Sequence, residues 1–290
     1  MIVSEEQSVC LNFGKPNQKN THIFQIFYDD VTRSLIDKGF TPFDNIINPR
    51  PDWCEYWSFR SIWEQKRSGL SSSDYLGIFS PRFREKTGLS SAEVFEAVDS
   101  SEQSVISFSP HLHHIAMFNN VFEQGEKWHP GLIQTMTATL KYLGISFDCS
   151  ATLGTLKNTI FSNYFVARVS VWDDLMVLGE GLFNAAENGT LALQQALNQD
   201  VPYFRGPVPM KVFVFERMIN VLLWHHQLHA SLGMNIDRWA QLKMITPQLM
   251  SRYLTLDALK SQYLSTGQVP YLNQYVIQKN ELLQLQLSLS

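Results

Sequence analysis

The stretch HIFQIFYDDVTRSLIDKG, residues 22–39, joins a short apolar run to a helical pattern. Its first part, HIFQIFY, is rich in β-branched and aromatic side chains and is bounded by polar residues, which is typical of a buried strand. Its second part places Val31, Leu35 and Ile36 at helical spacing, with Gly39 as a stop. We therefore expect a strand followed by a helix, the unit from which α/β sheets are built.

Outward from this unit, the same alternation continues along the chain. The runs that end at Ser80 and Pro110 are short and apolar, which is typical of interior strands, and TIFSNYFVA (159–167) alternates like a further strand. Helices are expected over PDWCEYWSFRSIWEQ (51–65), GLSSAEVFEAV (88–98) with a Ser90/Glu93 capping box, HPGLIQTMTATLKYLG (129–144), SVWDDLM (170–176) with Ser170 as its cap, and KVFVFERMINVLLWHH (211–226). The pattern predicts an α/β sheet with helices on both sides.

Composition excludes several classes of protein. The chain has 290 residues, 44% of them hydrophobic, and a net charge of 23 minus 27, or −4. It has no basic run with interleaved aromatic residues, so a nucleic-acid partner is not expected. No basic start leads into an apolar stretch, and no window approaches the roughly 18 apolar residues of a membrane span, so we expect a cytoplasmic protein. Cys10, Cys54 and Cys149 are widely spaced, which fits reduced thiols better than a disulfide framework or a zinc cluster.

Three segments are expected along the chain. Residues 1–20 are rich in Asn, Gln and Lys and are predicted to be a flexible lead-in. Residues 21–235 carry the strand and helix alternation and form one domain. Residues 236–290 are rich in Gln and Tyr, with weak helical patterning. We expect a mostly helical extension there, which packs on the domain, forms a homo-oligomer contact or meets a membrane-associated assembly partner at the inner membrane.

Residues that follow the predicted strands are the first site candidates, because ligands of α/β sheets bind at the carboxyl ends of the strands. The basic side chains of SPRFREK (80–86) would neutralise a diphosphate, and an aromatic ring after the first strand would stack on a base. The alternative is that the basic side chains form a solvated turn. The strand-end candidates are Tyr28, Ser80, Arg82, Arg84, Lys86, Ser109 and His111.

Polar residues inside apolar runs are the second set of candidates. Asn158, Asn163 and Tyr164 interrupt one such run, and Glu216 and Arg217 stand together in another. Burying an unpaired charge costs on the order of several kcal/mol, so these two side chains either reach the surface or have a functional role. For the asparagines, the alternative is that they satisfy backbone groups at strand ends.

Short blocks of the sequence resemble bacterial glycosyltransferases of the GT-A type found in surface-polysaccharide gene clusters. The blocks are EYWSFRSIW, YLGIFSPRF, SVISFSP, NYFVARVSVWDDL and VFVFERMINVLL. The resemblance implies a GT-A-like (Rossmann-like) mixed sheet, and transfer of a sugar from a nucleotide-sugar donor to a glycan or lipid-linked glycan. In those families the first strand, the GIFSPRF-like block and the third strand border the nucleotide-sugar. The NYF block and the ER helix face the acceptor.

The resemblance therefore implies that the strand-end candidates bind the donor and that Asn163, Tyr164, Arg217 and Asn220 bind the acceptor. The chain departs from the pattern in two ways. SPRF stands where the relatives have His-Tyr-Arg-Arg, and no Asp-x-Asp follows the third strand, where many GT-A enzymes hold a divalent metal on the diphosphate. A manganese or magnesium cofactor is left open, and His111 at the Asp-x-Asp position is expected to contact the phosphate.

Glu216 is the candidate general base. An inverting transferase needs one carboxylate that deprotonates the acceptor hydroxyl, and Glu216 resembles the GT-A base in its position on a helix. Asn220, four residues further on, shares its helix face. The alternative is that Glu216 and Arg217 form an exposed helix start after GPVPM, where the helix dipole favours an acid.

Histidines are the remaining metal-ligand candidates, in HLHH (111–114) and in HHQLH, where His225 and His229 are one helical turn apart. No HExxH pattern supports them, so a His-based metallohydrolase is the weakest expectation. A stronger alternative to the transferase is a non-catalytic glycan- or nucleotide-binding module of a polysaccharide assembly complex, which the missing Asp-x-Asp favours.

Overall fold

The computed structural model of the protein describes residues 19–203 and 206–289. Most of the predicted lead-in, including Cys10, lies outside these ranges.

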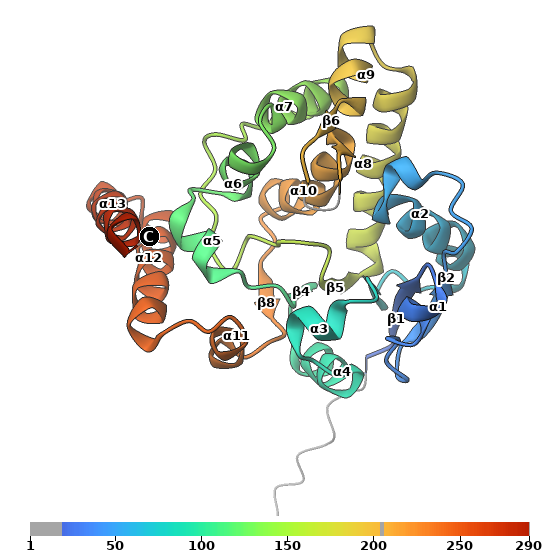
Figure 1. The fold of residues 1–290 in the computed structure, drawn as a ribbon, viewed down its shortest axis with the longest axis horizontal. Helices are drawn as coiled ribbons and strands as arrows, with labels where there is room; N and C mark the ends of the chain where they lie inside the picture. The colour runs from blue at the N-terminus through green and yellow to red at the C-terminus, as the bar shows by residue number, and fades with distance from the viewer. Residues whose placement is uncertain (1–18, 204–205, 290) are drawn as a thin grey trace, which may run out of the picture.

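Six strands form a mixed sheet in the order β2-β1-β3-β5-β4-β8 (Figure 1). The strands are β1 (Thr21–Phe27), β2 (Thr41–Asp44), β3 (Tyr75–Phe79), β4 (Val105–Ser107), β5 (Phe165–Arg168) and β8 (Ala230–Leu232), while β6 (Asp200–Val201) and β7 (Val208–Pro209) form a separate pair. β1 is parallel to β2 and β3, and β4 is parallel to β8, whereas β5 runs antiparallel between β3 and β4. All strands of the sheet except β5 therefore end at the same edge.

Helices cover both faces of the sheet, as expected. They are α1 (Asp30–Arg33), α2 (Glu55–Lys66), α3 (Phe83–Thr87), α4 (Ser91–Ser100), α5 (Leu112–Met117), α6 (Val121–Trp128), α7 (Leu132–Tyr142), α8 (Val169–Asn188), α9 (Leu191–Asn198), α10 (Met210–His225), α11 (Ile236–Leu242), α12 (Pro247–Thr266) and α13 (Val269–Leu289), with 3-10 turns at Pro51–Trp53 and Arg67–Gly69. In β3, Leu76 and Ile78 join one core cluster and Tyr75 and Phe79 the other, because successive side chains of a strand point to opposite faces. The first cluster packs α2 and α6 to α10 on one face, the second packs α3, α4 and α11 to α13 on the other, and α5 contributes to both.

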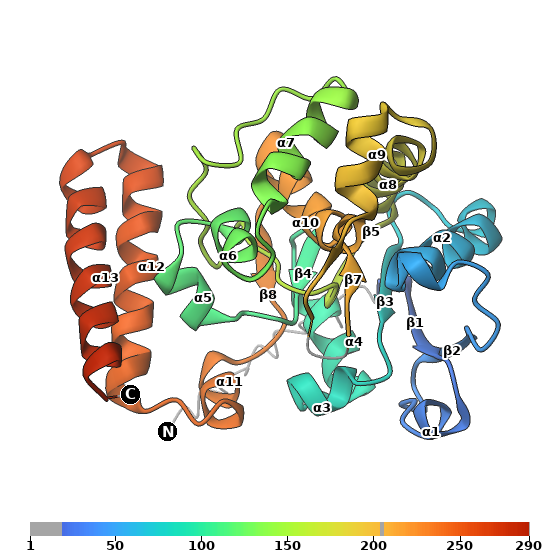
Figure 2. The same cartoon turned by 45° about the horizontal axis from the view of Figure 1, so that its top comes forward.

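The chain ends in helices, as predicted. α12 and α13 lie side by side as a hairpin at one side of the molecule (Figures 1 and 2). Lys260 of α12 is fully buried and donates to the backbone oxygens of Ile115 and Phe118, the second at 3.2 Å. This side chain ties the hairpin to the end of α5.

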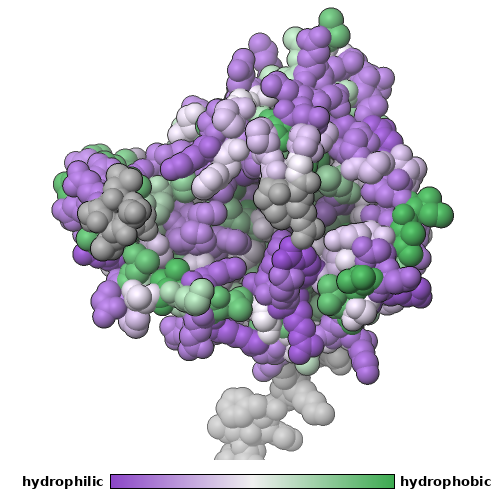
Figure 3. All heavy atoms as spheres, viewed as in Figure 1, coloured by the Kyte–Doolittle hydropathy of each residue, from purple (hydrophilic) through white to green (hydrophobic). Residues whose placement is uncertain are grey.

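The surface offers little apolar area on the side drawn in Figure 3, where hydrophilic side chains dominate and apolar ones form a few separate patches. Within residues 19–203 and 206–289, no helix combines the length and the apolarity that crossing a bilayer requires.

The helix expected after the first strand is shorter than predicted. α1 ends at Arg33, and Asp29 caps its start by accepting the Thr32 N–H at 2.6 Å. Beyond α1, the buried side chain of Gln25 accepts the Asp37 N–H at 2.8 Å. This hydrogen bond holds the segment around Asp37 against the edge of the sheet, where further helical turns were expected.

The strand expected over residues 159–167 begins only at Phe165. The N–H groups of Ile160 and Ser162 donate to the side chains of Asn220 at 2.7 Å and Glu216 at 3.2 Å. Side chains of α10 thus take the backbone donors that a neighbouring strand would pair.

Ser170 does not cap the helix that follows, contrary to the prediction. α8 begins at Val169 without a side-chain cap. Its first N–H groups, those of Val169 and Ser170, donate instead to the backbone oxygens of Asp74 at 2.8 Å and Ser72 at 3.2 Å. The loop before β3 therefore satisfies donors that a cap would otherwise serve.

Candidate functional site

A cleft opens at the edge of the sheet where the parallel strands end. It encloses about 310 Å³ and adjoins a second hollow of about 400 Å³. One wall comes from the ends of β1 and β3, and the others come from the start of α2, from residues 162–164 before β5 and from α10. The cleft and the hollow share Tyr28, Cys54, Glu55, Ser80 and Pro81.

Many of the residues predicted from the sequence line this cleft. They come from segments that are far apart along the chain, so the fold brings four of the donor-side candidates, two of the acceptor-side candidates and the candidate base to one cavity. The residues that it brings together are Tyr28, Ser80, Arg82, Lys86, Asn163, Tyr164 and Glu216.

Glu216 lies in the second turn of α10, and its side chain is 32% exposed. Its Oε1 accepts the Ser162 N–H at 3.2 Å, and its Oε2 lies 3.9 Å from Nη1 of Arg217. A carboxylate has about four acceptor positions, so these contacts leave Glu216 with lone pairs to spare.

Glu55 is a second carboxylate in the cleft and was not among the sequence candidates. It begins α2 directly after Cys54, whose positive φ of +46° bends the chain at this point. Its Oε2 accepts a hydrogen bond from Asn163 Nδ2 at 3.0 Å. Burial raises the pKa of Glu55, and the charge of Glu216 adds to this rise, while Asn163 and Lys86 oppose it. The one feature of the sequence that could have indicated Glu55 is its position as an acidic residue at the start of a helix rich in aromatic residues.

Two cationic side chains also line the cleft. Lys86 Nζ lies 5.2 Å from the centre of the Tyr164 ring, and Arg82 Nε donates to Glu85 Oε2 at 2.7 Å. The hydroxyls of Tyr164 and Ser80 share a hydrogen bond of 2.6 Å. Burial raises the pKa of Tyr164 above its usual range, so this hydroxyl stays neutral at physiological pH.

Two of the predicted donor ligands lie outside the cleft. Arg84 has a side chain that is 67% exposed, with Nη1 3.8 Å from Asp37 Oδ2. Ser109 is buried, and its hydroxyl donates to the backbone oxygen of Phe161. Arg84 therefore faces solvent, and Ser109 has its hydrogen bond inside the protein.

Two predicted acceptor ligands are also buried away from the cleft. The Arg217 guanidinium donates to Phe213 O at 2.9 Å and to Gln124 Oε1 at 3.1 Å, and burial lowers its pKa. Asn220 is fully buried and holds both the N–H and the C=O of Ile160, at 2.7 and 2.9 Å. Both residues therefore support the cleft wall from behind.

His111, the remaining donor candidate, lies outside the cleft in a cluster with His113 and His114. One ring nitrogen of each lies within 4.8 Å of the others. Burial lowers the pKa of His113 to about 4 and of His114 to about 3, and it lowers the pKa of His111 well below its ordinary value. All three rings are therefore neutral at pH 7. His225 and His229 are exposed near the end of α10.

The cleft offers manganese or magnesium two carboxylates, those of Glu55 and Glu216, and no third acidic side chain among the described residues that line it. These ions prefer several carboxylate or carbonyl oxygens. In the described part of the chain, the histidine cluster is the one group of three or more converging His, Cys, Asp or Glu side chains. We therefore derive no chemical step in the cleft through a metal ion.

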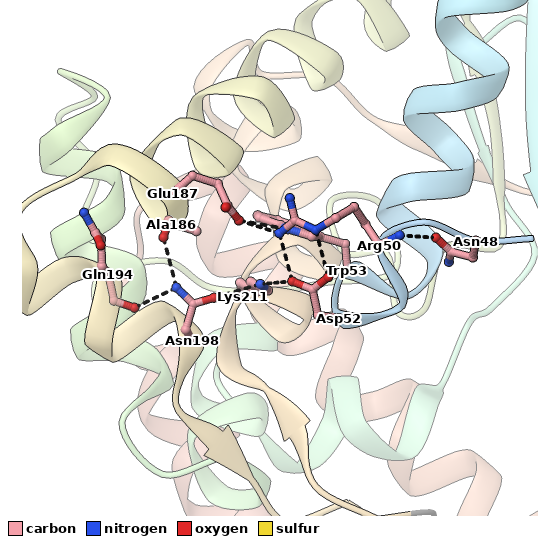
Figure 4. A network of polar contacts seen from close by, with 9 residues as sticks. All are labelled: Asn48, Arg50, Asp52, Trp53, Ala186, Glu187, Gln194, Asn198 and Lys211. Atoms are coloured by element: carbon pink, nitrogen blue, oxygen red, sulfur yellow. Dashed lines mark hydrogen bonds and ion pairs between the residues drawn. The ribbon is translucent and has the colours of Figure 1, made fainter.

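A polar network lies beside the cleft, and its side chains point toward one another in Figure 4. Arg50 donates to Asp52 at 3.0 Å and to Glu187 at 2.6 Å. Lys211 Nζ lies 2.5 Å from Asp52 Oδ2 and 4.5 Å from the centre of the Trp53 ring. The hydrogen bond from Arg50 is the main reason that the pKa of Asp52 falls to about 2. Because Trp53 lines the cleft, this network fixes one of its walls.

Comparisons of the chain with models of protein families, with curated proteins and with solved structures found no match. The fold and the cleft define the class: an α/β protein with a mixed sheet and a cavity of ligand size at the strand ends.

Proposed function

We propose that the protein is a GT-A-like glycosyltransferase that moves a sugar from a nucleotide-sugar donor to a glycan acceptor. The observation that carries this proposal is one cleft that holds the Glu216 carboxylate together with Lys86, Arg82 and the ring of Tyr28. Sugar transfer needs a base for the attacking hydroxyl and cations for the leaving diphosphate within one cavity. The mixed sheet flanked by helices agrees with the proposed architecture.

In an inverting transfer, the Glu216 carboxylate accepts the proton of the acceptor hydroxyl while that oxygen bonds to the anomeric carbon. The bond from the anomeric carbon to the diphosphate oxygen breaks, and the diphosphate leaves with the electron pair. Lys86 would offset its negative charge, and Arg82 would do so by exchanging Glu85 for a phosphate oxygen. Tyr28, 44% exposed after β1, offers a ring on which a base stacks.

Glu55 and Asn163 would bind sugar hydroxyls beside the reacting centre. A carboxylate accepts from a hydroxyl and an amide both donates and accepts, so together they match both roles of a hydroxyl group. Their mutual hydrogen bond of 3.0 Å fixes the orientation of the two side chains before a ligand arrives.

A non-catalytic binding module is the competing function, and one contact favours it. Glu216 Oε1 already accepts the Ser162 N–H, so this carboxylate shapes the loop before β5 and need not do chemistry. A module of this kind binds a glycan or a nucleotide and never consumes a sugar-nucleotide donor.

The test is calorimetry with uridine, guanosine, thymidine and cytidine sugar nucleotides, combined with an assay for nucleotide release. We expect one donor to bind and to be hydrolysed slowly without acceptor, at a rate that EDTA does not change. Binding without nucleotide release, with or without glycan acceptors, would identify a binding module. If no sugar nucleotide binds, the transferase and a nucleotide-binding module both fail and a glycan-binding module remains, whereas rescue by manganese after EDTA would contradict the metal-independent cleft.

A further inference from the structure

The histidine cluster follows β4 and lies at the start of α5. His111 and His114 are three residues apart, and His113 precedes His114 directly. Rings from one short segment thus converge until one nitrogen of each lies within 4.8 Å of the other two. Small ring rotations would bring nitrogens at that separation to the distance of about 2.0–2.1 Å from a common ion.

Aromatic side chains from other parts of the fold hold these rings. His113 stacks on Trp239, with ring centres 5.7 Å apart and planes at 21°. Phe161 contacts His111 and His114, with ring centres 5.5 and 5.4 Å away. Packing from two sides limits the rings to small rotations, so a ligand that needs all three finds them close to the required arrangement.

The buried Nδ1 atoms of the three rings have no hydrogen-bond partner within residues 19–203 and 206–289. Leaving a buried polar atom unpaired costs free energy, and three neighbouring imidazoles share that cost here. An ion bound by the cluster would engage three of the ring nitrogens. His129 also has a buried Nδ1 without a hydrogen-bond partner, and its ring stacks on Phe213 with ring centres 3.5 Å apart. It is not part of the cluster.

The ligand chemistry selects the ion. Three neutral imidazoles suit zinc, copper and nickel, whereas magnesium, calcium and manganese prefer oxygen. No carboxylate among the described residues joins the group, and the nearby positive charges of Lys243, Lys86 and Arg217 disfavour an ion held by charge alone. Coordinate bonds from imidazole would have to supply the affinity.

A solvent path reaches the cluster. A hollow of about 660 Å³ is lined by His113 and His114 and also by Glu123 and Glu126. It lets an ion enter, and it leaves room for water at the fourth position of a tetrahedral site.

We infer that His111, His113 and His114 bind one transition metal ion with the coordination preference of zinc, outside the cleft and independently of sugar transfer. The ion faces the hollow that His113 and His114 line, whereas none of the three histidines lines the cleft.

The test uses full-length protein without a polyhistidine tag, stripped with a chelator and titrated with zinc by calorimetry. We expect one equivalent of zinc to bind, magnesium and manganese not to bind at these residues, and cobalt to give the visible spectrum of a four-coordinate site. The double variant His113→Leu/His114→Leu should lose stoichiometric uptake and remain folded, because leucine fills the space of an unpaired ring.

The matched control is His225→Ala/His226→Ala, an adjacent exposed pair whose loss should leave zinc uptake unchanged. His111→Asn is the second variant, since asparagine tolerates the left-handed φ of +32° at this position, and it should weaken zinc at least tenfold. Circular dichroism and melting curves check that each variant folds. Absence of stoichiometric uptake by the unaltered protein, or uptake that survives both cluster variants, would overturn the inference.

Discussion

Charged side chains gather in two neighbouring regions, the cleft and the network beside it, and they are treated differently. In the network, Asp52 accepts from both Arg50 and Lys211, so opposite charges meet directly. In the cleft, the closest hydrogen-bond donors to the carboxylates of Glu216 and Glu55 are the neutral N–H groups of Ser162 and Asn163. The contrast teaches that a charge paired with an opposite charge stabilises the cleft wall, whereas a carboxylate that keeps free acceptor positions remains available to a ligand.

The largest effect is expected from breaking the network. Asp52→Ala leaves the ammonium group of Lys211, whose side chain is 2% exposed, without its carboxylate. The free energy of unfolding should fall by about 3 kcal/mol, the lower end for a buried pair, because Asp52 itself is partly exposed. Urea denaturation measures this. Glu64→Ala, which removes an exposed partner of Arg60 at 3.3 Å, is the control and should cost less than about 1 kcal/mol. Equal losses of unfolding free energy in the two variants would contradict the stabilising role of the network.

Glu216→Gln should show the opposite pattern. Glutamine keeps an oxygen to accept the Ser162 N–H but cannot take a proton, so melting temperature should hold while turnover falls about a hundredfold, or about 2.7 kcal/mol. Initial rates and melting curves from the same preparation measure both. A well-folded variant with near-normal turnover would remove Glu216 from the chemistry, and a loss of stability would assign it to the loop.

Lys86→Ala should weaken donor binding by about 1.5–3 kcal/mol, which is roughly a ten- to hundredfold change in Kd. Its charge-assisted contact with the diphosphate is the reason. Arg84→Ala is the matched control from the same segment, because this side chain is 67% exposed and lies outside the cleft. Calorimetry with the donor found for the unaltered protein decides; similar affinity losses in both variants would point to general charge attraction.

The smallest effect is expected from Lys260, a buried charge whose direct hydrogen-bond partners are backbone oxygens. It differs in this from Lys211, which pairs with a carboxylate. Burial lowers its pKa to about 7 from 10.5, with Asp257 and Glu123 opposing the shift and Lys279 adding to it. Between these values the unfolded chain keeps a proton that the folded protein releases, so stability rises with pH and is lowest below pH 7. The free energy of unfolding should gain about 1 kcal/mol from pH 7 to 8. Lys260→Met should lack this gain, and equal slopes would contradict the shift.

Local signals in the sequence predicted the α/β class and several of its elements, because they act over a few residues. Ser90 and Glu93 form the expected capping box. Predictions failed where distant side chains decide the backbone, as at Ile160, whose N–H and C=O both bind Asn220.

The same limit applies to the site. Apolar periodicity marked Glu216 and Arg217 as unusual, but a rotation of about 100° between neighbours separates the cleft from the core, and the pattern did not say which residue faces which side. Glu55 depends on the bend at Cys54, which periodicity does not reveal.

Because β5 is antiparallel, the chain leaves and re-enters the sheet at adjacent positions. Ser107 pairs directly with Phe165, and the Phe108 N–H donates to Tyr164 O at 2.8 Å. Residues 109–163 are thus an excursion whose two ends are neighbours, so a change of length in one of its exposed turns need not shift the register of the strands. Because α6 and α7 within this excursion pack into the core, its exposed turns are the places where a change of length would alter the surroundings of the histidine cluster or the cleft wall without rebuilding the sheet.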